Sequence, residues 1–330
     1  MPGIFSLSID VELAWAFVHR GRIDLAKMTQ VSMNVRKIMN KLFGLFEAYQ
    51  IPVTWNILGH LILDHCSKKD ESALPHPDMP RPSYSWLNDD WYRYDPCTQV
   101  TSDPAWYGKD IVDRIAHYVE TSKLSHEIGC HSFSHQLFGD SGCSENVARA
   151  EILKCMQLMK TEYNIIPETF AFPRDHVGHL DLLKESGFVS FRDVPAKLYP
   201  CLELERTFSR YLKTYFSLAA QLLSYYFLFP PHVVRSRQTS CGLIGIQGCL
   251  AYGEKPLVPL EFLTIKAKQG IDRASREGAA FVVYTHLRDF GANRRFFSQF
   301  DRVLRYAKRK RDEGNLLVLT MSDLASKRSK

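Results

Sequence analysis

Two acidic residues stand one residue apart at the end of an apolar segment near the start of the chain. Ile4 to Ile9 has the character of a short strand, and Asp10 and Glu12 follow, separated by Val11. If the strand continues, both side chains project from the same face, because side chains alternate along a strand. Neighbouring carboxylates are costly unless a cation lies beside them. The pair therefore indicates a divalent metal bound by one carboxylate while the other takes a proton, although acids at strand ends also cap helices.

Two histidines spaced four apart give a stronger signal. The segment 131–135 reads HSFSH and directly follows an expected strand at 126–130. On a helical turn, imidazoles at positions i and i+4 face the same point and can share one metal ion. The alternative is a chance pair, with one histidine capping and the other packed. Taken with the two acids, His131 and His135 favour a metal site built from two distant segments.

Other ionisable residues stand at the ends of later apolar runs. His286 closes the run 279–284, and a rim histidine that binds no metal can serve as a general acid. After the run at 169–172, Arg174 could orient a carboxylate, and His176 or Asp175 could contact a substrate. A helix cap is the plainer interpretation of Asp175.

Strand and helix patterns alternate along the chain. This order predicts a mainly parallel sheet, and about seven strands with as many helices favour a closed or nearly closed α/β barrel. Polar residues at the strand ends would then converge on one rim. After the first strand, further strands are expected at 53–58, 126–130, 168–172, 187–191, 241–247, 279–285 and 315–319, and helices at 26–49, 107–122, 144–162, 178–186, 209–228, 258–277 and 294–313.

Residues 67–106 interrupt this alternation. They are rich in Pro, Asp, Trp and Tyr and have no helical period, which predicts a long insertion over the rim. So long a loop is usually functional or disordered. The aromatic residues at 84–94, which include Trp86 and Trp91, favour function because disordered segments are poor in aromatic residues.

The composition is that of a globular protein. The chain has 330 residues, of which 45% are hydrophobic, enough for one large core or two smaller ones. We expect one catalytic domain over 1–330, with a helical C-terminal part from about 290. The net charge is +6, but the basic run 308–311 is followed by two acids and is typical of a solvated helix face, so no nucleic-acid partner is expected.

Cysteine usage and hydropathy bear on location. The eight cysteines form no C-x-x-C pair, which argues against a zinc ribbon and a disulfide framework and predicts reduced thiols. The start MPGIFSLSID lacks the pattern of a secretory signal, so a cytoplasmic protein is expected. The apolar stretch 218–229 is shorter than the ~20 residues of a membrane span. We expect a buried helix there, with peripheral contact to a membrane or lipid carrier as the alternative.

In these motifs the chain resembles the polysaccharide deacetylase family, also called carbohydrate esterase family four or the NodB homology domain. The family motif H-S-x-x-H matches 131–135 letter for letter and is the most specific match. The resemblance extends from residue 4 to about 290. The remaining landmarks are Asp10 and Glu12, 54–59, 170–174 around Pro173, loosely Phe191-Arg192-Asp193, and Tyr284-Thr285-His286.

The resemblance implies a distorted (β/α)7-type barrel and a division of roles. Asp10 would be the general base and His286 the general acid, while Glu12, His131 and His135 would hold a divalent metal, with Zn²⁺ the best match to two imidazoles and a carboxylate.

The chain also departs from the family pattern. The usual pair of aspartates is split by Val11 and ends in glutamate, and the fourth-motif tryptophan is missing near 193. The third-motif arginine falls at Ala171, so Arg174 would have to reach the base, with Pro173 and His176 near the substrate.

The implied reaction is removal of an N-acetyl or N-formyl group from an amino sugar in cell-envelope polysaccharide, O-antigen or glycolipid biosynthesis. A cytoplasmic enzyme suits a nucleotide- or lipid-linked sugar, on which Trp86 and Trp91 could stack, although burial is the usual fate of such rings. One alternative is hydrolysis of a linear or cyclic amide of a small nitrogenous metabolite. Another is a metal- and carbohydrate-binding protein without turnover, which would be expected to lack a base or an acid such as Asp10 or His286.

Overall fold

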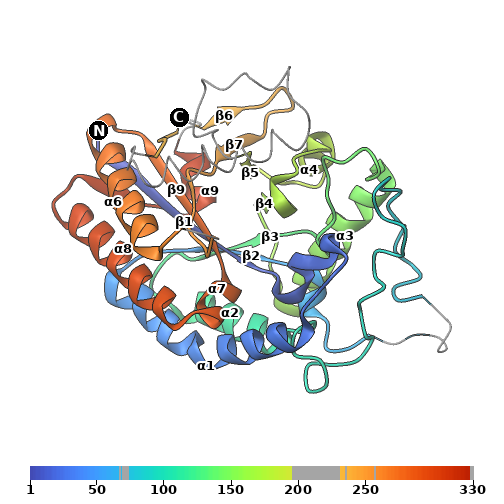
Figure 1. The fold of residues 1–330 in the computed structure, drawn as a ribbon. Coiled ribbons are helices and arrows are strands. Elements are labelled where there is room, and N and C mark those ends of the chain that lie inside the picture. Colours follow the sequence, from blue (N-terminus) through green and yellow to red (C-terminus); the bar gives the residue numbers. More distant parts are fainter. Residues whose placement is uncertain (67, 69–73, 195–230, 235, 256–257, 328–330) are drawn as a thin grey trace, which may run out of the picture.

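A curled, mainly parallel sheet forms the centre of the molecule (Figure 1). The structure is a computed structural model, and it describes residues 1–330 except 67, 69–73, 195–230, 235, 256–257 and 328–330. The described strands are β1 (Gly3–Val11), β2 (Thr54–Ile57), β3 (Glu127–Cys130), β4 (Thr169–Ala171), β5 (Ser190–Asp193), β6 (Arg237–Gln238), β7 (Ile244–Gln247), β8 (Leu250–Ala251), β9 (Ala280–His286) and β10 (Leu316–Val318).

The strand order is β6-β7-β5-β4-β3-β2-β1-β9-β8, with β10 also pairing with β1. Only the β6–β7 pair among these is antiparallel. In the described residues the edge strands β6 and β8 do not pair with each other, but a bridge from Val234 to Ala280 links the segment before β6 to β9. The predicted distorted barrel is therefore confirmed, in its nearly closed form.

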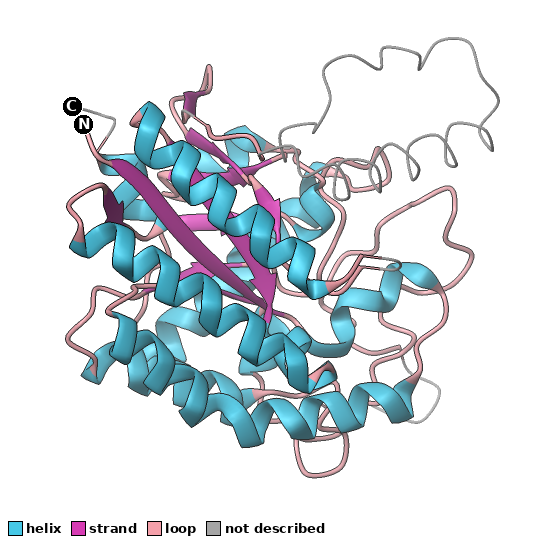
Figure 2. Cartoon of the chain, turned by 60° about the vertical axis from the view of Figure 1, so that its left-hand side comes forward, coloured by secondary structure: helices cyan, strands magenta, loops and turns pink. Residues whose placement is uncertain are grey.

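Helices cover the outside of the curl (Figure 2). Strand β1 is buried along its whole length, as expected for a central parallel strand with both faces covered. Helix α1 begins where the Asp24 side chain accepts a hydrogen bond from the Lys27 amide. The helices are α1 (Leu25–Tyr49), α2 (Lys109–Thr121), α3 (Glu145–Tyr163), α4 (Leu180–Glu185), α6 (Leu260–Glu277), α7 (Leu287–Ala292), α8 (Arg294–Asp312) and α9 (Met321–Ser326), with 3-10 turns η1 (Leu13–Arg20), η2 (Gly59–Ile62) and η3 (Pro173–Asp175).

The described residues of the insertion form neither helix nor strand between η2 and α2. Its aromatic side chains nevertheless pack against the core, and Trp91 and Tyr92 are fully buried. The helix expected at 209–228, and with it the proposed membrane contact at 218–229, lies outside the described residues. Among the described helices, none is both long enough and apolar enough to span a membrane.

Candidate active site and metal centre

The carboxyl ends of four neighbouring strands bring the predicted site residues together. In the sheet register, Asp10 on β1 lies opposite Asn56 on β2 and opposite His286 on β9. Strand β3 ends at Cys130, so His131 emerges at the same edge. Residues far apart in sequence therefore converge because parallel strands end at one rim.

Glu12, His131 and His135 form a buried group whose ligand atoms all lie within 4.8 Å of one another. The Glu12 Oε2 atom lies 3.1 Å from His131 Nε2 and 2.7 Å from His135 Nε2. The expected helical turn at 131–135 is wrong: this segment is a loop in which Ser132 and His135 adopt positive φ angles of 62° and 69°. Both imidazoles contact Glu12 from a loop with two left-handed residues, not from successive turns of a helix.

The hydrogen bonds of His131 show that this group suits a cation. Its Nδ1 atom lies 2.7 Å from the Ala171 carbonyl oxygen, which only accepts, so Nδ1 carries the proton. Burial lowers the pKa of His131 to about 4, so the ring is neutral at neutral pH and Nε2 holds a lone pair. That lone pair faces a Glu12 carboxylate oxygen. Two facing lone pairs repel each other unless a cation lies between them. The Ala171 carbonyl orients the imidazole in the way that hydrogen-bond partners of zinc-binding histidines do.

Asp10 is held by two partners. The Arg192 guanidinium binds it in bidentate fashion, with both N–O distances 2.7 Å, and Asn56 Nδ2 donates to Oδ1 at 2.8 Å. Burial raises the pKa of Asp10, but the attraction of Arg192 outweighs it, so the pKa lies well below its ordinary value. Asp10 is therefore an ionised carboxylate whose Oδ2 atom faces His286 at 4.0 Å.

Arg192, and not the expected Arg174, orients the Asp10 carboxylate. Arg174 is exposed, with a positive φ of 56°, whereas Arg192 is buried on β5. Arg192 packs its guanidinium over the Tyr284 ring at 4.5 Å, and its Nε lies 3.6 Å from Asp175. The expectation that Arg174 orients the base is therefore wrong. The segment Phe191-Arg192-Asp193, matched only loosely to the family pattern, was the signal that contained the true partner.

His286 faces the two carboxylates from the other side of the site. Its Nε2 atom lies 3.6 Å from Glu12 Oε1, and its Nδ1 lies 3.3 Å from Asp289 Oδ2. Burial lowers the pKa of His286, but the hydrogen bond to the Asp289 carboxylate outweighs it, so the pKa is raised above its ordinary value. This environment favours the protonated, proton-donating form.

Replacing Asp289 should reverse the sign of this shift. In Asp289→Asn the carboxylate is lost, burial prevails, and the pKa of His286 should fall below the ordinary value of about 6.5. Proton NMR titration of the metal-free protein would measure it, with His286→Gln identifying the resonance. A midpoint unchanged by Asp289→Asn would contradict this account.

Arg288 was not anticipated from the sequence, although it follows His286 by two residues. Its guanidinium contacts the Glu12 carboxylate and lies 5.1 Å from the centre of the Phe17 ring. Its positive charge adds to the stabilisation of the buried acid. A cation so close in sequence to a rim histidine was the available signal.

Glu151 on α3 binds the 131–135 loop through hydrogen bonds. It is buried, and its carboxylate accepts hydrogen bonds from the Phe133 amide at 3.0 Å, the Ser134 amide at 2.7 Å and the Ser134 hydroxyl at 2.5 Å. Tyr92 of the insertion donates to it at 3.2 Å. Nothing in the sequence marks Glu151, because a helical glutamate is ordinarily exposed.

Removing this carboxylate should destabilise the protein strongly. Glu151→Ala leaves several buried donors unpaired, at about 1–3 kcal/mol each, so the free energy of unfolding should fall by roughly 3 kcal/mol or more. Glu151→Gln is the matched control, because its amide oxygen still accepts from the loop. Urea unfolding would compare them. Equal midpoints for the two variants would show that the loop does not depend on this acceptor.

The remaining predicted contact residues are only partly available to a ligand. Trp91 is 1% exposed, with its indole Nε1 donating to the Ser134 carbonyl at 3.0 Å, so its predicted stacking on a substrate is wrong. Trp86 is 42% exposed but stacks on Tyr84 and donates to Asp140. Pro173 is buried, and His176 is exposed just after η3. Of these four, Trp86 and His176 stay candidates.

A pocket of about 770 Å³ adjoins the site. Arg288 and Asp289 line the pocket. Arg288 also contacts Glu12 and Asp289 also contacts His286, so these two residues belong to both the pocket and the site. Its cationic residues outnumber its acids: they are Arg20, Lys27, Lys255, Arg288 and Arg295, against Glu254, Glu261 and Asp289. The pocket is therefore suited to a ligand that carries negative charge.

Solved structures share this architecture. A protein named as a polysaccharide deacetylase from Mycobacterium smegmatis matches with a TM-score of 0.57 and 12% identity, covering 99% of this chain and 91% of that one. One from Pseudomonas aeruginosa, named in the same way, matches with a TM-score of 0.57 and 12% identity over 98% and 89%. The chain has the polysaccharide deacetylase fold. PuuE allantoinase shares this fold, with a TM-score of 0.55 and 12% identity over 98% and 89%.

The two comparisons at the level of sequence find no match. No protein-family model matches the chain. No curated protein sequence matches it either. The polysaccharide deacetylase fold is thus recognised from the structure as a whole, at an overall sequence identity of 12%.

Proposed function

We propose that the protein is a metal-dependent hydrolase that removes an N-acyl group, acetyl or formyl, from an amino sugar. One observation carries the proposal: a potential metal site lies beside both a candidate base and a candidate acid. The potential ligands are Glu12, His131 and His135, the base is the ionised Asp10, and the acid is His286. A non-catalytic binding protein would have no need of the last two residues in this arrangement.

Each residue has a place in the reaction. A divalent ion held by Glu12, His131 and His135, most suitably Zn²⁺, would polarise the acyl carbonyl and lower the pKa of the attacking water. Asp10 accepts a proton from that water as the new C–O bond forms. His286 then donates a proton to the sugar nitrogen as the C–N bond breaks, giving a free amine and a carboxylic acid. Arg192 keeps Asp10 ionised and oriented throughout.

We further propose that the sugar is attached to a phosphate-containing carrier, nucleotide or lipid, as an intermediate in cell-envelope polysaccharide, O-antigen or glycolipid biosynthesis. The cationic pocket beside His286 supports an anionic carrier. Lys27→Ala should raise KM for a diphosphate-linked sugar and leave KM for the free sugar unchanged. Lys37→Ala, an exposed lysine on the same helix outside the pocket, is the control.

Release of acetate and formate tests the reaction itself. The purified protein would be assayed on N-acylated nucleotide sugars, glycolipids and oligosaccharides, with bound metal quantified in the same preparation. We expect release from a carrier-linked amino sugar that stops when the metal is chelated. Turnover of none of these substrates by the metal-loaded protein would exclude the proposal.

The second candidate is hydrolysis of a linear or cyclic amide of a small nitrogenous metabolite. The shared fold with an allantoinase favours including it. It uses the same metal, base and acid but needs no large cationic pocket. Activity on cyclic ureides or small amides, without acetate or formate release from any sugar, would replace the first proposal by this one.

A further inference from the structure

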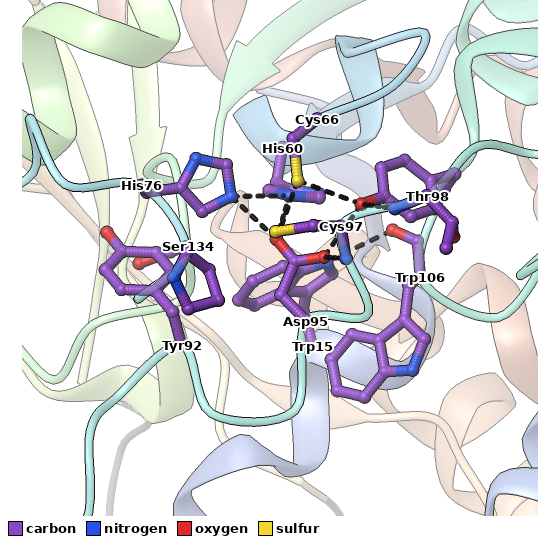
Figure 3. Close-up of polar contacts among 12 residues, drawn as sticks. Trp15, His60, Cys66, His76, Tyr92, Asp95, Cys97, Thr98, Trp106 and Ser134 are labelled. Atoms are coloured by element: carbon purple, nitrogen blue, oxygen red, sulfur yellow. Dashed lines mark hydrogen bonds and ion pairs between the residues drawn. The ribbon is translucent and has the colours of Figure 1, made fainter. Parts of the chain in front are cut away.

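A second group of potential metal ligands lies where the insertion meets the barrel (Figure 3). It consists of His60, Cys66, His76 and Asp95, whose ligand atoms all lie within 4.8 Å of one another. His60 belongs to η2, directly after β2, while Asp95 lies in the second half of the insertion. The group therefore joins the barrel to both halves of the insertion.

Three of these side chains converge on one oxygen of the fourth. The Asp95 Oδ2 atom lies 2.6 Å from His76 Nε2, 3.0 Å from His60 Nε2 and 3.3 Å from Cys66 Sγ. The two ring nitrogens are themselves only 3.1 Å apart. A carboxylate oxygen has about two lone-pair sites, one fewer than the groups that approach it. Ligands about 2.0–2.1 Å from a tetrahedral zinc ion are separated by about 3.3 Å, which is close to the spacing of the two nitrogens.

The other oxygen of Asp95 is fixed by neighbours that are not ligands. Its Oδ1 atom accepts hydrogen bonds from the Tyr107 hydroxyl at 2.7 Å and from the Cys97 amide at 3.0 Å. The Cys66 amide donates to the Thr98 carbonyl at 3.2 Å. Such outer partners orient the ligands of metal sites and leave the inner oxygen free to bind the ion.

The site is closed. His60 is fully buried under the Trp15 ring, whose centre lies 4.3 Å from that of the imidazole, and Asp95 is 3% exposed. Four protein ligands leave no open position for substrate, which is the pattern of structural zinc sites. A thiolate and a carboxylate also supply the two negative charges that balance Zn²⁺.

We propose that His60, Cys66, His76 and Asp95 bind a structural zinc ion that fixes the insertion to the barrel. The position of the insertion affects the candidate active site through two hydrogen bonds to the 131–135 loop. The His60 amide donates to the Phe133 carbonyl at 2.9 Å, and the Trp91 indole of the insertion donates to the Ser134 carbonyl. The ion thus holds in place the insertion and the 131–135 loop that it contacts. This site is separate from the one formed by Glu12, His131 and His135.

Metal content and a spectroscopic probe test the proposal in the full chain. Purified wild-type protein should contain two metal ions, and Cys66→Ser with His76→Ala should contain one. Cys241→Ser, which changes a thiol outside the site, should keep both. When Co²⁺ replaces zinc, a thiolate-to-cobalt band in the near ultraviolet should be present in the wild type and absent in Cys66→Ser.

The cobalt band also separates this site from the first one. It should persist in His131→Ala with His135→Ala, because that site has no thiolate. Absence of the band from the wild type would overturn the proposal, even if the Cys66 and His76 variant did not fold. Unchanged metal content in that variant would overturn it too, as would a disulfide between Cys66 and the neighbouring Cys97, detected by mass spectrometry.

Discussion

Asp10→Asn is expected to abolish N-acyl hydrolysis while the protein keeps its fold and its metal. An amide at this position cannot take the proton of the attacking water, and loss of a positioned general base lowers the rate by roughly 10²–10⁴-fold. The substitution preserves the shape of the side chain, and the ligands Glu12, His131 and His135 are untouched. Acid release under saturating substrate, with metal quantified in parallel, measures the effect.

A matched control for this variant is Asp193→Asn. Asp193 is also a buried carboxylate near an arginine, with Arg237 Nη2 3.1 Å away, but it contacts none of the proposed ligands. The control should stay within a few-fold of the wild type. Activity of Asp10→Asn near the parent level would remove Asp10 as the base and leave the metal site unaffected.

His131→Ala with His135→Ala is expected to lose the metal ion of the candidate active site and all activity that depends on it. Two of the three ligands disappear, and Glu12 alone cannot hold a zinc ion against dilution. Elemental analysis after gel filtration should show one metal ion fewer per chain than in the wild type, with unchanged circular dichroism.

His179→Ala controls for the loss of a partly buried histidine. His179 Nε2 contacts the Cys143 carbonyl and belongs to neither metal group. This variant should keep its full metal content. Unchanged metal content in the double variant would mean that the two histidines do not bind the ion.

The sequence predicted the order of elements well because each depends on local patterns. Apolar runs and helical periodicity placed β1, β9, α1 and α8 within a few residues of their observed bounds. The residues at the strand ends could also be anticipated, since the carboxyl ends of parallel strands share one rim. Asp10, Glu12, His131, His135 and His286 do come together there.

Partners that approach from other strands were harder to predict. Arg174 stands where a local motif would place the orienting arginine, but its backbone turns outward, and Arg192 reaches Asp10 from β5. Glu151 is likewise invisible in sequence, because its role depends on where α3 lies against the 131–135 loop. Local spacing does not encode such distances, since they follow from packing across the whole barrel.

The sequence by itself determined the kind of fold and the residue types at its rim, because hydrophobic periodicity and short motifs are local properties. Tertiary structure alone decided which charges meet. It paired Asp10 with Arg192 and buried Trp91. It also brought together four potential metal ligands that no C-x-x-C motif indicates in the sequence: His60, Cys66, His76 and Asp95. The physical reason is that electrostatic and ligand contacts act over a few ångströms in space, whatever the separation of the residues along the chain.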